Sequence, residues 1–176
     1  GENATWTLAD GTLTVSGTGR MTDYNSNSPA PWADQADEIT AVVVEDGITT
    51  VGGSSFEGCT NLTLKDLTLG HTKEPGYCAG GVLDLQRCTN VTVENTGLFG
   101  CGTIGVQGYQ CVNMALTGNE IYECSYGGIS LNQCQKVDMT NNTFRDLGEE
   151  YGGYIYNVSG CTDLTFDGAN IPGDDY

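Results

Sequence analysis

The sequence predicts an all-β protein that forms a parallel solenoid with about 23 residues per coil. Two interleaved cysteine series set this period, each with three members 23 residues apart: Cys78, Cys101 and Cys124, and Cys88, Cys111 and Cys134. A fixed period of about 20 to 50 residues is typical of solenoids and other repeat architectures. No stretch keeps a helical period of about 3.6 residues over several turns, so we expect few helices.

The residues between the cysteines recur with the same period and alternate between apolar and polar columns. Steps of 23 residues give one apolar column and, beside it, a mostly polar one: Val91, Met114 and Val137, then Thr92, Ala115 and Asp138. A period of two residues indicates β-strands. In the coil 104–126 the pattern predicts strands at about 104–107, 114–117 and 121–124. Neighbouring coils should pair their strands in parallel, about 4.8 Å apart.

Two more coils join this register when short insertions are allowed at one corner. Four extra residues near 148–153 place Cys161, Leu164, Phe166 and Ile171 in the established columns. Six extra residues around 72–77 do the same for Cys59, Leu62 and Leu64. Solenoids tolerate insertions at such corners, because a loop there does not disturb the stacked strands.

Residues 127–147, GGISLNQCQKVDMTNNTFRDL, resemble the repeat of right-handed parallel β-helix proteins of the pectate-lyase-like superfamily. The resemblance covers about residues 59–171 and implies a right-handed coil. It also implies that an asparagine after the second strand stacks into a ladder, a role we assign to Asn119 and Asn142, with Asn95 and Asn141 as further candidates. The superfamily includes lyases, hydrolases, epimerases and binding proteins, so the resemblance predicts a fold and not one function.

Residues 1–58 carry a different pattern. Residues 5–15 alternate apolar and polar positions on both sides of Asp10 and Gly11, a strong hairpin signal. Trp6 and Leu8 should therefore face the same side as Leu13 and Val15. We expect this hairpin to cap the first edge of the solenoid.

The same segment resembles the opening module of the BspA-like family of bacterial surface leucine-rich repeat proteins. The similar stretches are Trp6-Thr7-Leu8, Asp10-Gly11-Thr12-Leu13, Gly17-Thr18-Gly19, Pro31-Trp32 and residues 56–62. The resemblance implies an N-terminal cap over 1–58, a β-helix over 59–176, and a place in a longer multidomain chain. Ile39 and Leu62 are 23 residues apart, so we expect one repeat length to join the two parts.

The charge of the chain limits the classes of partner that it is expected to bind. Among 176 residues, 23 are acidic and 6 are basic, which gives a formal net charge of −17 at pH 7. Nucleic acid is not an expected partner, because few cations are available for phosphates. Membrane insertion is not expected either, because no apolar run has the length of a span. Composition and resemblance together favour an extracellular or cell-surface bacterial protein, and neutral sugars, cations or basic proteins as ligands.

The cysteines are expected to be free thiols inside the coil. Stacked strands hold successive Cβ atoms about as far apart as their Cα atoms, which exceeds the Cβ separation of about 3.8 Å in a disulfide. Buried thiols then act as small apolar residues. One or two disulfides remain an alternative. A zinc site is disfavoured, because His71 is the only histidine and the cysteines lack the usual close spacing.

One pair of carboxylates is a candidate for chemistry. The 23-residue step places Glu123 beside Asp146 at roughly 5 Å, a separation that suits a retaining glycosidase pair or a calcium clamp. Arg145 should stack on Tyr122 next to them. A solvated, salt-bridged turn region explains the same residues, and we favour it. No cofactor is predicted, and calcium at Glu123 and Asp146 is the single candidate.

The outer face of the first strand in each coil carries two polar columns: Asp84, Gln107, Ser130 and Asn157, and Gln86, Tyr109, Asn132 and Ser159. We predict ligand binding there by amide, hydroxyl and aromatic groups, at Asp84, Gln107, Tyr109, Asn132 and Asn157. Lyases and hydrolases of the superfamily place several Asp, Arg and Lys residues on this face, and this chain has few. Ordinary exposed strand composition is the alternative explanation.

The expected function is therefore a non-catalytic, secreted or cell-surface module that binds a glycan or a partner protein. The first alternative is a polysaccharide lyase or glycoside hydrolase that uses Glu123 and Asp146, with Arg145. The second alternative is a purely structural spacer in a longer surface protein.

Overall fold

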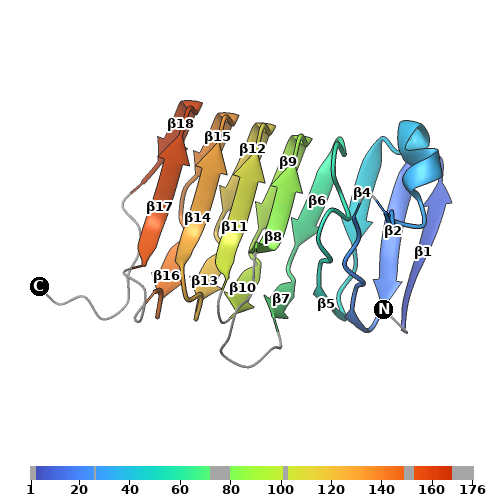
Figure 1. Ribbon diagram of the computed structural model, residues 1–176, viewed down its shortest axis with the longest axis horizontal. Coiled ribbons are helices and arrows are strands. Elements are labelled where there is room, and N and C mark those ends of the chain that lie inside the picture. Colours follow the sequence, from blue (N-terminus) through green and yellow to red (C-terminus); the bar gives the residue numbers. More distant parts are fainter. Residues whose placement is uncertain (1–2, 26, 72–79, 101–102, 149–152, 168–176) are drawn as a thin grey trace, which may run out of the picture.

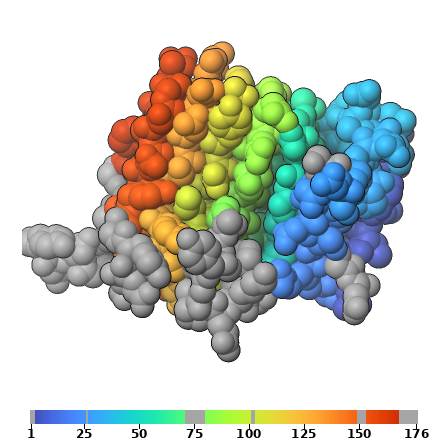
Figure 2. All heavy atoms as spheres, in the orientation of Figure 1, coloured from blue at the N-terminus to red at the C-terminus, as the bar shows by residue number. Residues whose placement is uncertain are grey.

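The computed structural model describes residues 3–25, 27–71, 80–100, 103–148 and 153–167. In these residues the chain forms eighteen strands and one short 3-10 helix, η1 (Ala33–Glu38). The coils follow one another along the long axis of the molecule, so that the sequence colours run in order from one end to the other (Figures 1 and 2). The all-β solenoid predicted from the cysteine spacing is confirmed.

Each complete coil contributes one strand to each of three sheets. Sheet 1 contains the first strands, in the order β17-β14-β11-β8, with bounds β8 (Gly81–Gln86), β11 (Ile104–Tyr109), β14 (Gly127–Asn132) and β17 (Tyr154–Ser159). Sheet 3 contains the third strands, in the order β16-β13-β10-β7, with bounds β7 (Thr68–His71), β10 (Gly97–Gly100), β13 (Glu120–Tyr122) and β16 (Thr143–Arg145).

Sheet 2 is the longest and continues into the N-terminal segment, in the order β1-β2-β4-β6-β9-β12-β15-β18. Its strands are β1 (Ala4–Ala9), β2 (Thr12–Gly17), β4 (Ala41–Val44), β6 (Leu62–Lys65), β9 (Thr89–Glu94), β12 (Val112–Thr117), β15 (Gln135–Met139) and β18 (Thr162–Phe166). A separate pair joins β3 (Gly19–Arg20) to β5 (Ile48–Thr50).

The strand register confirms the predicted coil length and both insertions. Met114 pairs with Val91 on one side and Val137 on the other, which are the partners that the cysteine period predicts. Leu64 pairs with Val93, the partner expected when the insertion around 72–77 is counted. Val137 pairs with Leu164, the partner expected when the insertion near 148–153 is counted. Ile171, also assigned to that coil, lies outside the described residues.

The predicted junction between Ile39 and Leu62 is wrong. Leu62 pairs with Val42 instead, so this coil is shorter than the regular ones. Ile39 follows η1, where its backbone N–H bonds to the carbonyl of Ala36. The coil is short because the turn between β4 and β6 contains the strand β5 but no first-sheet strand among the described residues.

The N-terminal residues form the expected hairpin. β1 and β2 pair antiparallel, with Trp6 opposite Val15 and Leu8 opposite Leu13. The turn needs Gly11, because its φ is +76° and an added Cβ would lie 2.5 Å from Thr40 Oγ1. The role of this hairpin as a leucine-rich-repeat cap stays a prediction.

The core is a continuous apolar column inside the coil. Leu116 and Met139 of neighbouring second strands are fully buried. In the same column Phe166 of β18 is 56 % exposed, and in sheet 1 Val158 of β17 is 44 % exposed. These last strands have a neighbour on one side only among the described residues, so the hydrophobic stabilisation that each coil gains from two neighbours is halved there.

Six cysteines are free in the described part of the chain: Cys59, Cys88, Cys111, Cys124, Cys134 and Cys161. Cys88, Cys111 and Cys134 are fully buried, as apolar residues would be. Their thiols bond to backbone carbonyls, for example Cys111 Sγ to Leu85 O at 3.3 Å. Cys78 and Cys101 lie outside the described residues.

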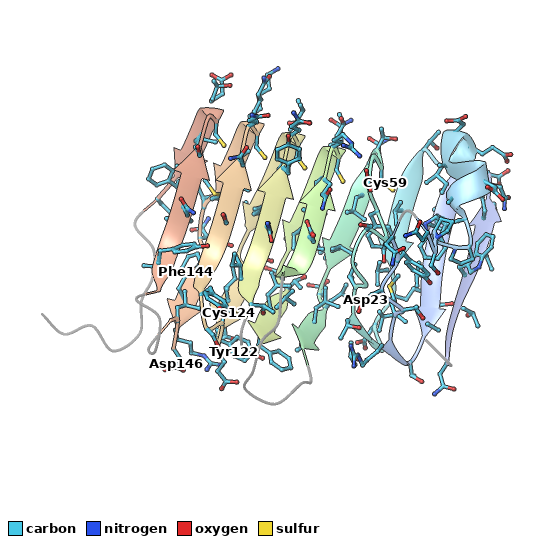
Figure 3. The ribbon with its side chains drawn as sticks, viewed as in Figure 1. Asp23, Cys59, Tyr122, Cys124, Phe144 and Asp146 are labelled. Atoms are coloured by element: carbon cyan, nitrogen blue, oxygen red, sulfur yellow. The ribbon has the colours of Figure 1, made fainter. Side chains whose placement is uncertain are left out.

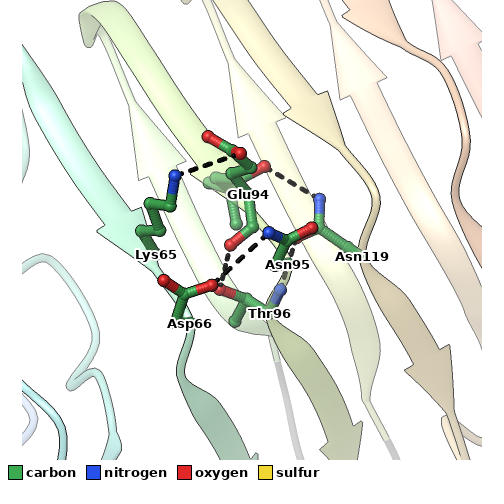
Figure 4. A network of polar contacts seen from close by, with 7 residues as sticks. Lys65, Asp66, Glu94, Asn95, Thr96 and Asn119 are labelled. Atoms are coloured by element: carbon green, nitrogen blue, oxygen red, sulfur yellow. Dashed lines mark hydrogen bonds and ion pairs between the residues drawn. The ribbon is translucent and has the colours of Figure 1, made fainter.

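Asn119 and Asn142 form a buried ladder at the turn between sheets 2 and 3. Asn119 Oδ1 accepts from the backbone N–H of Thr96 at 3.0 Å, and Asn142 Oδ1 accepts from the N–H of Asn119 at 3.0 Å. Figure 4 shows the first rung beside the exposed pair Lys65 and Glu94. Each ladder asparagine also donates to a strand carbonyl, and both are at most 2 % exposed.

Asn95 and Asn141 do not belong to this ladder. Both side chains are exposed, and their φ values are +50° and +58°. Each one precedes the ladder position and turns the chain in the left-handed conformation that asparagine tolerates well. The assignment of these two residues to the stack was therefore an error of one position.

Candidate functional site

The acidic cluster around Arg145 lies at the edge of sheet 3. Tyr122 pairs with Arg145 in the strand register, which makes Glu123 and Asp146 neighbours in adjacent coils. Both have φ of +53°, so both leave their strands at the same turn. Figure 3 places Tyr122 and Asp146 together at the lower edge of the solenoid, far from Cys59.

The guanidinium of Arg145 occupies the space between the carboxylates. Its Nε donates to Glu120 Oε1 at 2.8 Å, and Nη1 lies 3.2 Å from Asp146 Oδ2 and 4.0 Å from Glu123 Oε1. The guanidinium also lies 3.9 Å from the centre of the Tyr122 ring. The hydrogen bond that Arg145 donates to Glu120 is the largest cause that raises the pKa of Arg145.

The carboxylates of this cluster face solvent. The side chains of Glu123 and Asp146 are 62 % and 57 % exposed, so water screens their charges. The part of the chain that the structure describes contains no group of three His, Cys, Asp or Glu residues placed to hold a metal ion. Glu123 and Asp146 as a catalytic pair, or as calcium ligands, stay predictions.

The predicted ligand-binding residues lie in register on sheet 1. Gln107 pairs with Asp84 and Ser130, and Tyr109 pairs with Gln86 and Asn132. Asn157 follows Ser130 in the next coil. Burial raises the pKa of Asp84, and a hydrogen bond from Gln86 partly offsets this rise. These two columns are polar and partly buried to exposed, and the groove described next lies on a different sheet.

A groove of about 580 Å³ crosses the outer face of sheet 2. It spans five neighbouring strands, β6, β9, β12, β15 and β18. One column of its wall comes from paired strand positions: Thr63, Thr92, Ala115, Asp138 and Thr165. The other column comes from one residue per coil near the start of the strand: Asn61, Asn90, Asn113, Lys136 and Asp163.

The second column has an unusual backbone that explains its composition. All five residues have positive φ, between +55° and +60°. Asparagine and aspartate tolerate this conformation better than other residues with a side chain. Asn113 Nδ2 donates to Asn90 Oδ1 at 2.7 Å, and Asn90 Nδ2 donates to Asn61 Oδ1 at 3.0 Å, so three of the five form a surface amide ladder.

Sequence reasoning missed this groove. It identified Thr92, Ala115 and Asp138 as an outward column but attached no function to them. The recurrence of Asn61, Asn90, Asn113, Lys136 and Asp163 was the available signal, since their spacing follows the coils and their insertions. The positive φ that aims these side chains over the sheet could not be read from composition.

A second hollow of about 380 Å³ lies beside η1, with Tyr24, Trp32 and Ile39 among its walls. Trp32 is 4 % exposed and its Nε1 donates to Ser55 O at 3.2 Å. Its ring stacks on Phe56 and meets Tyr24 edge to face. These aromatic contacts build the core of the N-terminal segment.

Comparison with known families gives a match that covers most of the chain. The model of the right handed beta helix region matches residues 35–172, which is more than three quarters of the sequence. The match begins before residue 59, where the sequence analysis placed the start of the β-helix. Neither the curated proteins nor the solved structures include a match to the chain. No helix in the described residues is long and apolar enough to cross a membrane. From its coil register and this match, the chain belongs to the right-handed β-helix family.

Proposed function

We propose that this chain is a non-catalytic module of a bacterial secreted or cell-surface protein, and that it binds an extended, uncharged glycan in the groove on sheet 2. The groove carries this proposal, because it crosses five coils without interruption and its walls present amide and hydroxyl groups. Sugar hydroxyls both donate and accept hydrogen bonds, as these groups do.

The dimensions of the groove favour a chain molecule as ligand. Equivalent side chains repeat once per coil, about 4.8 Å apart. This spacing is close to the length of one pyranose unit in an extended glycan, so successive sugars can meet equivalent groups in successive coils. The rigid stacked strands fix these groups in advance, which lowers the entropic cost of binding.

The charge of the chain favours an uncharged glycan. With a formal net charge of −17, the surface repels polyuronates and other polyanions. The groove itself carries Lys136, Asp138 and Asp163, so its charges nearly balance. A neutral chain enters this groove without repulsion.

The test is titration calorimetry of the protein with neutral, acidic and amino polysaccharides, beside an assay for released reducing ends. We expect heat of binding with a neutral glycan and no product. Asn113→Ala, on the groove, should weaken binding, whereas Asn132→Ala, on the predicted face of sheet 1, should not. The opposite result would move the site to Asp84, Gln107, Tyr109, Asn132 and Asn157. Absence of binding to every glycan would contradict the proposal and favour a partner protein or a spacer role.

The adjacency of Glu123 and Asp146 keeps a second candidate, a polysaccharide lyase or glycoside hydrolase. Two carboxylates at such a short separation suit a retaining mechanism. This candidate requires turnover of a polysaccharide that Glu123→Gln abolishes. If product forms at the same rate in Glu123→Gln and wild type, these carboxylates are not the catalytic pair.

We further propose that residues 1–58 are a leucine-rich-repeat cap, as their resemblance to surface leucine-rich repeat proteins implies. The antiparallel β1 at the end of sheet 2 supports this role. A chain that lacks residues 1–17 should expose the edge of β4 and associate, which size-exclusion chromatography would detect.

A further inference from the structure

One coil of the groove departs from the pattern of the others in both columns. In the outward strand column, Asp138 stands where the coils on either side have Ala115 and Thr165. In the left-handed column, Lys136 stands where the three preceding coils have asparagine. Both departures lie on the same strand, β15, which is the fourth of the five strands that the groove crosses.

Neither departure is explained by the fold. Asp138 Oδ1 is buried and has no hydrogen-bond partner in the described part of the chain. A buried polar atom without a partner costs folding free energy. Lys136 holds a φ of +56°, which asparagine would adopt more easily, and it forms no ion pair with another described residue. Lys136 also stands just beyond the end of the amide ladder, whose last hydrogen bond runs from Asn113 to Asn90.

Ala115 is the register partner of Asp138 on the neighbouring strand and has a small side chain. It is the only residue of the strand column without a polar side chain among the five that line the groove. A threonine there, as in β9 and β6, would add a hydroxyl and a methyl group next to Asp138. Ala115, Lys136 and Asp138 therefore line the same part of the groove, where Ala115 has the smallest side chain.

We propose that Asp138, Lys136 and Ala115 form the specificity subsite of the groove, and that this subsite recognises two adjacent hydroxyl groups of an uncharged sugar. One hydroxyl donates to the carboxylate of Asp138, which lines the groove, and its neighbour accepts from Lys136 Nζ. This inference rests on the proposed glycan function, and it identifies two adjacent hydroxyl groups as the part of the glycan that the protein recognises.

The charges of the subsite exclude other ligands. An amino sugar would pair with Asp138 but would be repelled by Lys136. A uronate would pair with Lys136 but would be repelled by Asp138 and by the net charge of the chain. A sugar with two neighbouring hydroxyls satisfies both groups, because a hydroxyl can donate to one and accept from the other.

The experiment is calorimetry with hexasaccharides of three types. The neutral type is cellohexaose or mannohexaose, the amino type is hexaglucosamine, and the acidic type is hexagalacturonate. We expect the wild type to bind a neutral hexamer most tightly. Asp138→Asn should weaken that binding by about 10- to 100-fold, because it replaces a charge-assisted hydrogen bond. Ala115→Thr, which introduces the residue type of β9, should weaken that binding because it adds bulk to the groove beside Asp138. Asp37→Asn, which removes the same charge from an exposed position on η1 outside the groove, is the matched control and should change binding less than about threefold.

The outcomes separate the subsite from the function. If the wild type binds a neutral hexamer and Asp138→Asn binds it equally well, the subsite is wrong and the glycan function stands. If the wild type prefers hexaglucosamine or hexagalacturonate, the charges of Asp138 and Lys136 do not select an uncharged sugar, and the proposed subsite is wrong. If no hexamer binds to the wild type, the proposed function itself fails. Circular dichroism of each variant shows that a loss of binding is not a loss of fold.

Discussion

The side chain of Asn142 accepts a hydrogen bond from the backbone N–H of Asn119 at 3.0 Å, within a core that is mostly apolar. Its Nδ2 group donates to Leu116 O at 2.7 Å. One side chain thus satisfies a donor and an acceptor that the turn between sheets 2 and 3 would leave buried and unpaired. The ladder allows the chain to turn sharply inside each coil without a loss of backbone hydrogen bonding.

Asn119→Ala should lower the free energy of unfolding by about 2–4 kcal/mol. The change leaves the N–H of Thr96 and the carbonyl of Val93 without partners, and each buried orphan costs about 1–3 kcal/mol. Denaturant unfolding followed by circular dichroism measures the loss. Asn113→Ala, in the same coil but on the exposed ladder, is the control and should cost less than about 1 kcal/mol. Equal losses in the two variants would contradict the structural role of the buried ladder.

Asp84→Asn should stabilise the protein at neutral pH and leave it unchanged in acid. Burial raises the pKa of Asp84 above its ordinary value of 3.8, so the folded state holds this proton more tightly than the unfolded state. The stability that the protonated form contributes is complete below pH 3.8 and is lost as pH rises through the folded pKa. The difference in Tm between variant and wild type should therefore grow from about pH 4 towards pH 7.

Asp37→Asn is the matched control for this pH series. It removes the same charge from an exposed position on η1. A pH dependence equal to that of Asp84→Asn would mean that net charge, and not burial of one carboxyl, governs the effect.

The thiols should be present but slow to react in the native protein. Burial raises the pKa of Cys59 to about 11, so at pH 8 only about a thousandth of it is thiolate. A hydrogen bond with Cys111 and then burial raise the pKa of Cys134 further. Titration with an aromatic disulfide reagent should be slow in buffer and should reveal at least six thiols in denaturant without reductant. Fewer than six thiols in denaturant would indicate disulfides and contradict the free cysteines in the column.

The coil length could be predicted from the sequence, because the residues that repeat with this period are buried inside the coil. Cys88, Cys111 and Cys134 occupy one buried column, where size and polarity leave few choices. The buried ladder was also readable at Asn119 and Asn142. Asn95 and Asn141 were misplaced by one residue, since the sequence does not state which of two adjacent turn residues points inward.

The groove was less readable for a physical reason. A solvent-facing column can hold many residue types without loss of stability, so its members do not repeat clearly. The register of Leu62 with Val42 was missed for a related reason, because Cys59 is the first cysteine of the chain and no earlier cysteine marks the length of this short coil. The register of irregular coils and the arrangement of exposed side chains could be assigned only from the three-dimensional structure.

Asp138→Thr should make the protein more stable and a weaker binder. Threonine is the residue at the equivalent positions of β9 and β18, so its shape and strand preference suit the site. The change removes a carboxylate oxygen that is buried without a partner, which should raise the free energy of unfolding by about 1 kcal/mol or more. Natural proteins retain such a cost where function requires the group, and gain stability when it is removed. Thermal unfolding and calorimetry on the same sample measure both quantities. Thr92→Asp is the reverse control, since it places a carboxylate in a coil that lacks Lys136, and it should lower stability without a gain in binding. If Asp138→Thr lowers both stability and affinity, the carboxylate supports the fold and has no separate part in recognition.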